Sequence, residues 1–418
     1  MPDDQAAVAA AWLAVLPKDD RSALTGGAST VRAVVPPVTT APAPDDPTQR
    51  IRIIDRQAGA DYQLLEQLGS GGMGTVWLAR QSGIARNVAL KRMRRRSKEI
   101  DRHRFISEAR ITGGLCHPNI IPVYELGVDT DGRLFYTMRP VMGRTWAECI
   151  ASLTIDENLE VLNRVAEAVA YAHSRGVLHR DLKPANMMLG DFGEVLVMDW
   201  GLACQMGTDD QKQSLVGTPA YMAPEMAQGR CDLISESGDV YQLGGMLLEI
   251  LVGEAPHVAD RTVAGCLTAA AANRLPRPSA RLRNEYGELL SIAERALATD
   301  PGQRFASVAD MIVALRMADR HRESLRLASR GLACLKRAHR SGHYEDFARS
   351  LFCLEESQAL WGGNIQAHDA ALEVRRDYAA QALERGDVDL AASLLHPQEP
   401  CHQALWERVQ QVKNPQSG

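Results

Sequence analysis

Three side chains that could carry out chemistry together stand within six residues of one another, in the string His179-Arg180-Asp181-Leu182-Lys183-Pro184-Ala185-Asn186. The carboxylate of Asp181 could accept a proton, the ammonium group of Lys183 could hold a phosphate, and the amide oxygen of Asn186 could bind a metal ion. In a chain of 418 residues one short match is only a hypothesis until its neighbours occur where that chemistry requires them. The rest of a phosphate-binding site therefore has to be found on either side.

A glycine-rich stretch lies upstream, flanked by apolar residues that alternate with polar ones as in a two-stranded ribbon. It runs from Leu68 to Val76 and reads L-G-S-G-G-M-G-T-V, which contains the pattern G-x-G-x-x-G-x-V. Glycines let the backbone lie against phosphate oxygens, because no Cβ stands in the way. A lone G-x-G-x-x-G would equally suit a dinucleotide-binding fold or a tight hairpin, so the residues that follow have to decide.

A strand-like run, Val88-Ala89-Leu90-Lys91, ends in a lysine 22 residues after Gly69, a distance that suits a hairpin followed by a third strand. A lysine that holds phosphates needs a carboxylate to orient it. Glu108 lies in a helical pattern and is the expected partner, whereas the alternative, Glu99, comes too early in the chain.

Further along, residues 217–225 read G-T-P-A-Y-M-A-P-E. Together with the glycine-rich stretch, the lysine at 91 and the string at 179–186, this segment resembles the protein kinases, and among them the bacterial Hanks-type serine/threonine kinases. The resemblance rests on seven motifs in order and covers residues 62–318. It implies an α+β fold of two lobes, a β-rich N-terminal lobe and a helical C-terminal lobe, with a catalytic loop at 179–186.

The resemblance implies a role for each residue of the site. Asp181 orients the attacking hydroxyl and accepts its proton, and Lys183 steadies the moving phosphoryl group. Lys91, oriented by Glu108, holds the α- and β-phosphates of ATP. Lys183 and the segment at 217–225 favour Ser or Thr hydroxyls of proteins as acceptors. The residues expected to bind ATP are Leu68, Gly69, Ser70, Gly71, Gly72, Met73, Gly74, Val76, Ala89, Lys91, Met138, Asn186 and Asp199.

Two D-x-G strings compete to supply the aspartate that binds the metal ion, Asp191-Phe192-Gly193 and Asp199-Trp200-Gly201. The first spells the commonest family motif but lies five residues after Asn186, between two apolar runs, so it is interpreted as a hairpin turn. Asp199 lies 18 residues after Asp181, which matches kinase spacing. Asn186 and Asp199 are therefore the expected ligands of Mg²⁺, with Mn²⁺ as an alternative, because hard oxygen ligands suit these ions.

Control by phosphate is suggested by Arg180, which precedes the catalytic aspartate. A guanidinium buried beside the base is expected to be poorly paired until a phosphate on the activation segment, residues 199–225, reaches it. Thr208 and Ser214 are the candidate phosphate acceptors, although either one taken singly would equally suit an ordinary loop hydroxyl. Thr218 is expected to contact the catalytic loop.

The resemblance also implies supporting roles for two side chains and one ion pair. Glu225 would be a buried acid that pairs with Arg304, and Asp239 would brace the catalytic loop from a helix. His179 is expected to pack and to form hydrogen bonds rather than to transfer protons.

Composition narrows the class of protein. The net charge of −5 gives no reason to expect nucleic acid, and no run of eighteen apolar residues could span a bilayer. Eight cysteines lie far apart without a C-x-x-C, so no zinc site or disulfide framework is expected and a reducing cytoplasm is inferred. Residues 1–61 are rich in Ala and Pro and are expected to be flexible, with Ala6–Leu16 either a frayed terminus or a short docking helix.

Residues 319–418 are expected to form an all-α extension made of helical hairpins. Leu325, Ala328, Leu332 and Leu335 recur at helical spacing on a basic helix, which is expected to pack its apolar side on a neighbour. An anionic membrane surface is the alternative ligand for that helix. Breaks at residues 361–364 and 385–387 separate the later helical stretches, and residues 378–391 resemble a tetratricopeptide hairpin. Such an extension would bind a protein partner or regulate the kinase domain.

The sequence thus predicts an ATP-dependent protein kinase that phosphorylates Ser and Thr of proteins and its own activation segment in bacterial signalling. One alternative is a nucleotide-binding scaffold without catalysis, against which the intact Lys91, Glu108, Asp181, Asn186 and Asp199 weigh. A second alternative is a small-molecule kinase, which would lack the segment at 217–225.

Overall fold

The computed structural model describes residues 50–51, 62–71, 74–95, 98–207, 217–258 and 262–414 of the chain. The chain divides into two compact units between Val313 and Ala314. Nearly all of residues 1–61, including Ala6–Leu16, lie outside the described residues, so the expectation of flexibility there stays a prediction.

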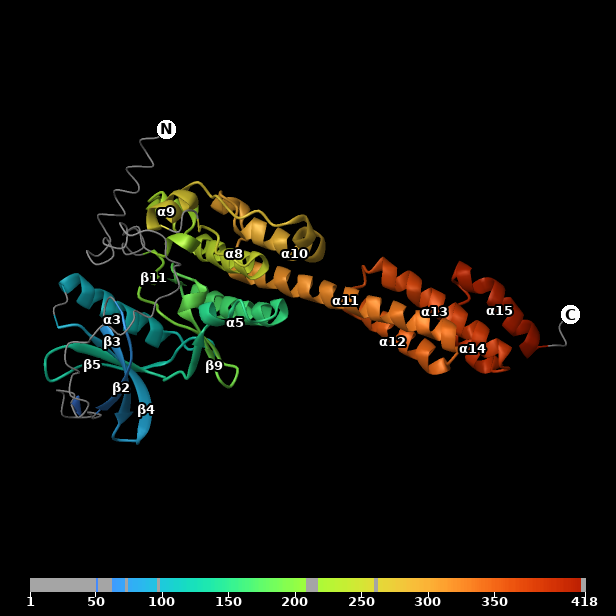
Figure 1. The fold of residues 1–418 in the computed structure, drawn as a ribbon, viewed down its shortest axis with the longest axis horizontal. Coiled ribbons are helices and arrows are strands. Elements are labelled where there is room, and N and C mark those ends of the chain that lie inside the picture. Colours follow the sequence, from blue (N-terminus) through green and yellow to red (C-terminus); the bar gives the residue numbers. More distant parts are fainter. Residues whose placement is uncertain are drawn as a thin grey trace. The chain divides into compact units, whose positions relative to one another are not determined.

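A six-stranded antiparallel sheet forms the N-terminal part of the first unit (Figure 1). Its spatial order is β1-β2-β3-β4-β6-β5. The strands are β1 (Arg50–Ile51), β2 (Tyr62–Ser70), β3 (Gly74–Gln81), β4 (Arg86–Met93), β5 (Val123–Val128) and β6 (Leu134–Met138). The glycine-rich stretch joins β2 to β3, where Ser70 pairs with Thr75.

The two faces of this sheet carry alternate residues of β4 and β6, as the two-residue period of a strand requires. On one face Val88 and Leu90 pack with Phe135. On the other face Ala89 packs with Met138, and helix α3 (Glu99–Gly114) covers this side. Helix α3 buries Phe105, Glu108, Ala109 and Thr112, whose spacing of three and four residues places them on one side of the helix. The sheet and α3 together position Lys91 and Glu108.

The C-terminal part of the first unit is helical, with α5 and α10 packed against the central helix α8 (Figure 1). Its α-helices are α4 (Trp146–Cys149), α5 (Ile155–Ser174), α7 (Pro224–Ala227), α8 (Glu236–Val252), α9 (Val263–Ala271) and α10 (Ala280–Ala296). Its 3₁₀-helices are η2 (Pro184–Asn186), η3 (Pro219–Tyr221), η4 (Cys231–Leu233) and η6 (Pro301–Gln303). Helix α5 begins with a capping box, in which Thr154 and Glu157 satisfy each other's backbone N–H groups.

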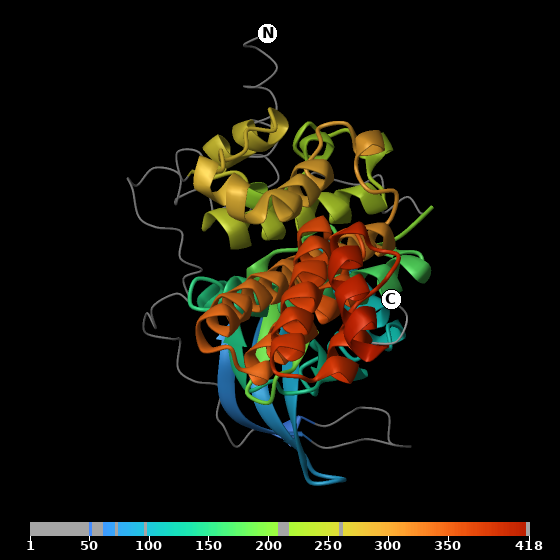
Figure 2. The same ribbon diagram turned by 90° about the vertical axis from the view of Figure 1, so that its right-hand side faces the viewer.

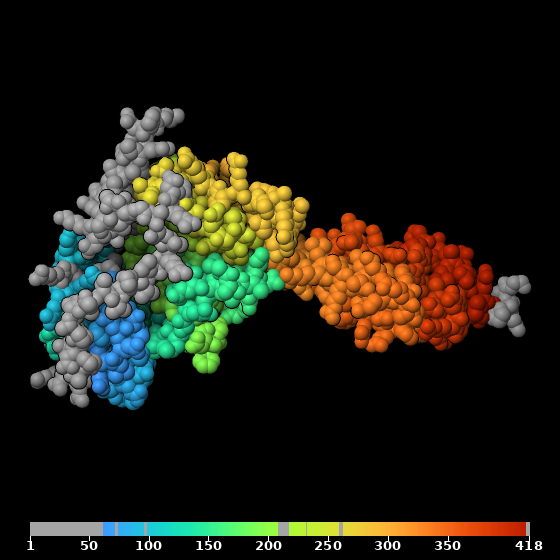
Figure 3. Space-filling model, in the orientation of Figure 1, coloured from blue at the N-terminus to red at the C-terminus, as the bar shows by residue number. Residues whose placement is uncertain are grey.

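In the described residues, five short strands alternate along the chain with these helices, and the loops of the site connect to them. They are β7 (Gly143–Thr145), β8 (Val177–Leu178), β9 (Met187–Gly190), β10 (Val195–Val197) and β11 (Cys204–Gln205). Strands β9 and β10 pair as an antiparallel hairpin, and Gly193 in its turn has a φ of +81°. The hairpin projects from the surface (Figure 3), and the side chain of Phe192 in its turn is 94% exposed. The interpretation of the first D-x-G string as a hairpin turn is confirmed.

The second unit is entirely helical in its described residues. Helix α11 (Val308–Ser341) enters it, and α12 (Tyr344–Leu360), α13 (Ile365–Glu384), α14 (Val388–Leu394) and α15 (Pro400–Lys413) follow (Figure 2). Helix α13 packs against α12, α14 and α15, with Phe347 stacked on Tyr378 in the core. Both predicted breaks, at residues 361–364 and 385–387, fall between helices. The predicted α+β fold with a helical extension is confirmed.

The buried face of α11 differs in one place from the face that the sequence indicates. Leu325 is 46% exposed, whereas its neighbour Ser324 is fully buried and Ala328 and Leu335 join the core. Ser324 is buried because its hydroxyl bonds the carbonyl oxygen of Ser357, at 2.8 Å, on α12. A polar contact between the helices therefore overrides the apolar pattern at this turn.

Close packing of α11 on α12 depends on Gly331. A Cβ added there would lie 2.7 Å from Cγ of Leu354 and 3.2 Å from the carbonyl oxygen of Ser350. Gly331→Ala is expected to destabilise the second unit by about 1–3 kcal/mol, because overpacking outweighs the better helix propensity of alanine. Gly362→Ala is the control, since a Cβ at that position meets no atom within 4 Å. Native-state hydrogen exchange of the α12 amides measures both, and equal protection in the two variants would contradict the prediction.

Candidate active site

The catalytic loop is held by a carboxylate from the start of α8. The oxygens of Asp239 accept hydrogen bonds from the backbone N–H groups of His179 and Arg180, each at 2.8 Å, and from Nε2 of His173, also at 2.8 Å. Burial acts to raise the pKa of Asp239, but His173 and the other contacts outweigh it and hold this pKa below its ordinary value. The carboxylate of Asp239 is therefore ionised, so both of its oxygens can accept hydrogen bonds from the loop.

A second residue of α8 binds the same loop. Gln242 accepts a hydrogen bond from the backbone N–H of Leu182 at 2.8 Å and donates one to the carbonyl oxygen of Arg180 at 2.9 Å. It lies one helical turn after Asp239, so both side chains leave the same face of α8. Arg180 has a φ of +67°, a conformation unusual for a residue with a side chain, and these bonds hold it there.

Asp181 lies at the centre of a compact group of polar side chains. Nζ of Lys183 donates to Oδ2 of Asp181 at 2.8 Å, and Oγ1 of Thr218 donates to Oδ1 at 2.7 Å. Lys183 also bonds Oγ1 of Thr218, and Nδ2 of Asn186 donates to the carbonyl oxygen of Asp181 at 2.8 Å. The structure thus brings together the three chemically active residues of the loop and adds Thr218, which meets the loop as the sequence indicated.

The lysine and the glutamate chosen as its partner meet across the space between sheet and helix. Nζ of Lys91, on β4, lies 2.6 Å from Oε1 of Glu108, on α3. The glutamate side chain is 3% exposed, so the pair is shielded from solvent. The alternative partner, Glu99, lies at the first turn of α3 with its side chain 77% exposed and pairs with Arg102 instead. Tyr136, which sequence reasoning missed, also bonds Oε1 of Glu108, at 2.8 Å.

Two of the described glycines in the stretch between β2 and β3 leave open space beside the backbone. A Cβ added at Gly69 or Gly71 would meet no atom within 4 Å, whereas one at Gly74 would lie 2.3 Å from the carbonyl oxygen of Arg92. Gly74 is therefore required by packing, whereas open space lies beside the backbone at Gly69 and Gly71. Gly72 and Met73 lie outside the described residues.

The remaining residues expected to bind ATP occupy the two strand pairs beneath this stretch. Val76 pairs with Lys91 between β3 and β4, and Ala89 pairs with Met138 between β4 and β6. Ala89 and Met138 are buried in the core on the α3 side, with Val76 packed against them. At the end of β2, Leu68 is 46% exposed and Ser70 is exposed too.

Two oxygen donors lie beside the catalytic loop, in a place that fits a divalent cation. The backbone N–H of Met198 donates to the carbonyl oxygen of Asn186 at 2.8 Å, which brings Asn186 next to Asp199. Because Nδ2 of Asn186 donates to Asp181, its amide oxygen is the atom left for a ligand. Among the described residues no group of three or more His, Cys, Asp and Glu could hold a metal ion. The carboxylate of Asp199 and the amide oxygen of Asn186 are ligands that suit a divalent cation, whose remaining ligands would come from outside these two residues.

His179 and Trp200 pack beneath the loop. Their rings are 4.6 Å apart, and both side chains are almost fully buried. Burial lowers the pKa of His179, and its Nδ1 accepts a hydrogen bond from the backbone N–H of Asp181 at 3.3 Å. A buried, neutral imidazole that supports the backbone is the packing role expected from the sequence.

Of the three residues expected to take part in control by phosphate, the structure describes only Arg180. Thr208 and Ser214 lie outside the described residues. Arg180 was expected to be poorly paired, and this is wrong for its Nε, which donates to the carbonyl oxygen of Leu202 at 2.7 Å. The reason is the backbone path after Trp200, which turns a carbonyl oxygen toward the guanidinium. A phosphate on the activation segment would therefore be an additional partner for Arg180, which already donates a hydrogen bond to Leu202.

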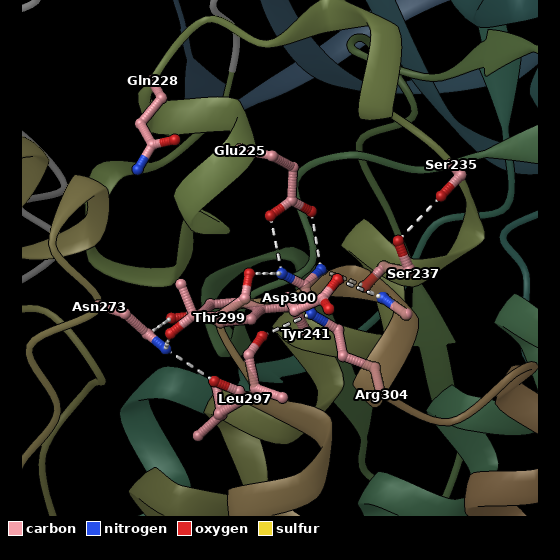
Figure 4. A network of polar contacts seen from close by, with 12 residues as sticks. Glu225, Gln228, Ser235, Ser237, Tyr241, Asn273, Leu297, Thr299, Asp300 and Arg304 are labelled. Atoms are coloured by element: carbon pink, nitrogen blue, oxygen red, sulfur yellow. Dashed lines mark hydrogen bonds and ion pairs between the residues drawn. The ribbon is translucent and has the colours of Figure 1, made fainter.

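A buried ion pair closes the segment at 217–225 (Figure 4). Nη1 and Nη2 of Arg304 each lie 2.7 Å from a different carboxylate oxygen of Glu225, and both side chains are nearly inaccessible to solvent. Arg304 also donates to the carbonyl oxygens of Ser237 and Ala298, both at 2.9 Å. The guanidinium lies 4.8 Å from the ring centre of Tyr241. This pair ties the chain after the active site to the helical part of the unit.

His173 and Gln242 are further site residues that sequence reasoning missed. Each is a buried polar residue in a helix whose buried positions are mostly apolar. A buried polar group needs a hydrogen-bond partner, so an isolated polar residue on an apolar helix face was the available signal. The sequence did not reveal which segment would supply the partner.

A β-rich part and a helical part that together carry Lys91, Glu108, Asp181, Asn186 and Asp199 define a protein kinase domain. A family model described as "Protein kinase domain" matches residues 62–314, and the chain belongs to that family. It is 31% identical over 389 residues to "Serine/threonine-protein kinase PknD" of Chlamydia abortus, and 37% identical over 265 residues to "Serine/threonine-protein kinase PknJ" of Mycobacterium tuberculosis. The two alignments cover 81% and 60% of this chain, but only 39% and 44% of those relatives. The chain thus spans less than half the length of either.

None of the described helices is both long enough and apolar enough to cross a lipid bilayer.

Proposed function

We propose that this chain is an ATP-dependent serine/threonine protein kinase that acts on protein substrates in bacterial signalling. The observation that carries the proposal is the set of contacts around Asp181, in which Lys183 and Thr218 each bond one carboxylate oxygen. The Lys91–Glu108 pair supports the same reaction from the other side of the site. The two relatives named above carry the same activity in their names.

Each residue then has a definite task. Asp181 accepts the proton of the substrate hydroxyl and orients that hydroxyl for attack, while Lys183 places positive charge where negative charge grows. Lys91, fixed by Glu108, holds the phosphates of the nucleotide. Thr218 bonds both Asp181 and Lys183, so it couples the segment at 217–225 to the reacting groups.

Asn186 and Asp199 are the residues that would hold a magnesium ion, or a manganese ion in its place. When bound, the ion neutralises charge on the phosphates of ATP. The hydrogen bond from Asn186 to Asp181 means that the same side chain also keeps the base in position. The chemistry itself requires mostly positioning and charge neutralisation, which is what these contacts supply.

The regions outside the active site complete the proposal. We propose a kinase domain at residues 62–318, a flexible segment at 1–61 and a tetratricopeptide-like extension at 319–418 that binds a protein partner or regulates the kinase domain. Autophosphorylation at Thr208 or Ser214 would place a phosphate on the segment that leads to Thr218. A cytoplasmic location is supported by the cysteines whose side chains are described, all of which are free thiols.

The function is tested by incubating the whole chain with Mg²⁺ and ATP labelled at the γ-phosphate, alone and with a generic basic protein substrate. Label on serine or threonine that disappears when EDTA removes the metal supports a protein kinase. Binding of ATP without any transfer of label would overturn the proposal and favour the non-catalytic scaffold. Label transferred only to small molecules would favour the remaining alternative.

A further inference from the structure

Tyr136 lies directly opposite Lys91 in the sheet. The two residues are paired across β4 and β6, so their side chains leave the same face, toward α3. The ring of Tyr136 lies 5.1 Å from that of Phe105, a buried residue of α3. Nζ of Lys91 lies 5.5 Å from the ring centre of Tyr136. The tyrosine thus contacts both the strand and the helix that carry the ion pair.

The hydroxyl of Tyr136 and the ammonium group of Lys91 converge on a single atom. Oε1 of Glu108 accepts from the hydroxyl at 2.8 Å and from Nζ at 2.6 Å. The other oxygen, Oε2, is buried without a hydrogen-bond partner among the described residues. It faces Gly201, where an added Cβ would lie 3.5 Å away. All the hydrogen bonding that holds this carboxylate therefore passes through Oε1.

We propose that Tyr136 is a positioning residue for phosphoryl transfer, which holds Glu108 and with it helix α3 in the place where the carboxylate orients Lys91. The inference rests on the proposed function. A single contact to Lys91 would leave the carboxylate free to turn about that contact, whereas two donors from neighbouring strands fix its orientation. Because Lys91 also has to reach the nucleotide, a second donor keeps Glu108 in place while the lysine is shared.

The chemistry of the tyrosine suits this role. Burial and the neighbouring Glu108 hold the pKa of Tyr136 well above its ordinary value, so the hydroxyl keeps its proton and remains a donor. The side chain is 5% exposed, so water cannot readily replace it. Loss of a hydrogen bond to a charged group is expected to raise the population of the locally opened state of helix α3 by about tenfold or more.

The test compares Tyr136→Phe with Tyr62→Phe. The first variant removes the hydroxyl and keeps the ring that packs on Phe105. The second removes another buried hydroxyl of the same sheet, which bonds Glu125 at 2.5 Å and lies outside the site. Tyr136→Phe is expected to speed hydrogen exchange of the α3 amides near Glu108 by about tenfold, and Tyr62→Phe to leave them unchanged. The kcat for phosphoryl transfer is expected to fall about threefold or more in Tyr136→Phe alone.

Faster α3 exchange together with a lower kcat supports the inference. In a chain that transfers phosphate, either change without the other, or the same behaviour in both variants, overturns it. The proposed function is judged separately by the unchanged chain. If that chain transfers no label, the function fails, and the positioning of α3 by Tyr136 is then decided by hydrogen exchange, which requires no catalysis.

Discussion

Asp181→Asn is expected to lower the rate of phosphoryl transfer by about a thousandfold. An amide cannot take the proton of the attacking hydroxyl, and general-base catalysis contributes about 10² to 10⁴ to such rates. The amide also has one acceptor in place of two, so it cannot keep the present hydrogen bonds from both Lys183 and Thr218. ATP binding should persist, because Asp181 does not belong to the residues around the nucleotide.

The chain offers a matched control for this variant. Asp191→Asn makes the same chemical change in the exposed turn between β9 and β10, and transfer should stay within about twofold of the unchanged chain. Initial rates of labelled phosphate transfer measure both variants. A rate for Asp181→Asn within tenfold of the unchanged chain would show that another group accepts the proton. A large loss in Asp191→Asn would mean that the hairpin turn was wrongly excluded from the site.

Arg304→Ala is expected to destabilise the first unit by about 3–5 kcal/mol. The substitution leaves the carboxylate of Glu225 buried without its counter-ion, which is the costly way to break a buried pair. It also removes the donors to the carbonyl oxygens of Ser237 and Ala298. Arg304→Lys should lower the unfolding free energy by less than Arg304→Ala does. An ammonium group keeps the charge but cannot bind two oxygens side by side.

The control for this prediction is an ion pair of the same unit that is open to solvent. Arg283 and Glu294 lie 3.0 Å apart with about half of each side chain exposed, so Arg283→Ala should cost less than about 1 kcal/mol. Urea unfolding followed by tryptophan fluorescence measures the change in the unfolding free energy. Equal losses for the two alanine variants would show that burial adds nothing to the Glu225–Arg304 pair.

The sequence was most informative where chemistry restricts both residue type and spacing. The string at 179–186 and the choice of Glu108 over Glu99 led to side chains that the structure brings into contact. The hairpin at 191–193 was recognisable because a Gly/Asp turn lay between two apolar runs. Helical spacing likewise indicated the extension, with its breaks in the right places.

Contacts that depend on tertiary placement were out of reach. Tyr136 and Gln242 look in sequence like ordinary members of a strand and a helix, and only the neighbouring segments give them their partners. The partner of Arg180 is a backbone carbonyl oxygen, and the direction of a backbone group is not written in side-chain identities. The sequence pattern put Leu325 on the buried face of α11, but its side chain is exposed, because the polar contact between Ser324 and Ser357 shifts that face.

Two side chains of α8, Asp239 and Gln242, bind the backbone of the catalytic loop and not its side chains. This affects which residues of the loop can change in sequence without a change in structure. Asp239 and Gln242 bond the N–H and the carbonyl oxygen of residue 180, groups that every amino acid except proline provides. Replacement of Arg180 by a residue that tolerates a positive φ, such as Asn or Gly, would therefore remove its contact with Leu202 and leave the path of the loop intact. The proposed regulation through residue 180 could thus be gained or lost over evolution without moving Asp181, whereas loss of Asp239 or Gln242 would remove bonds that hold the loop.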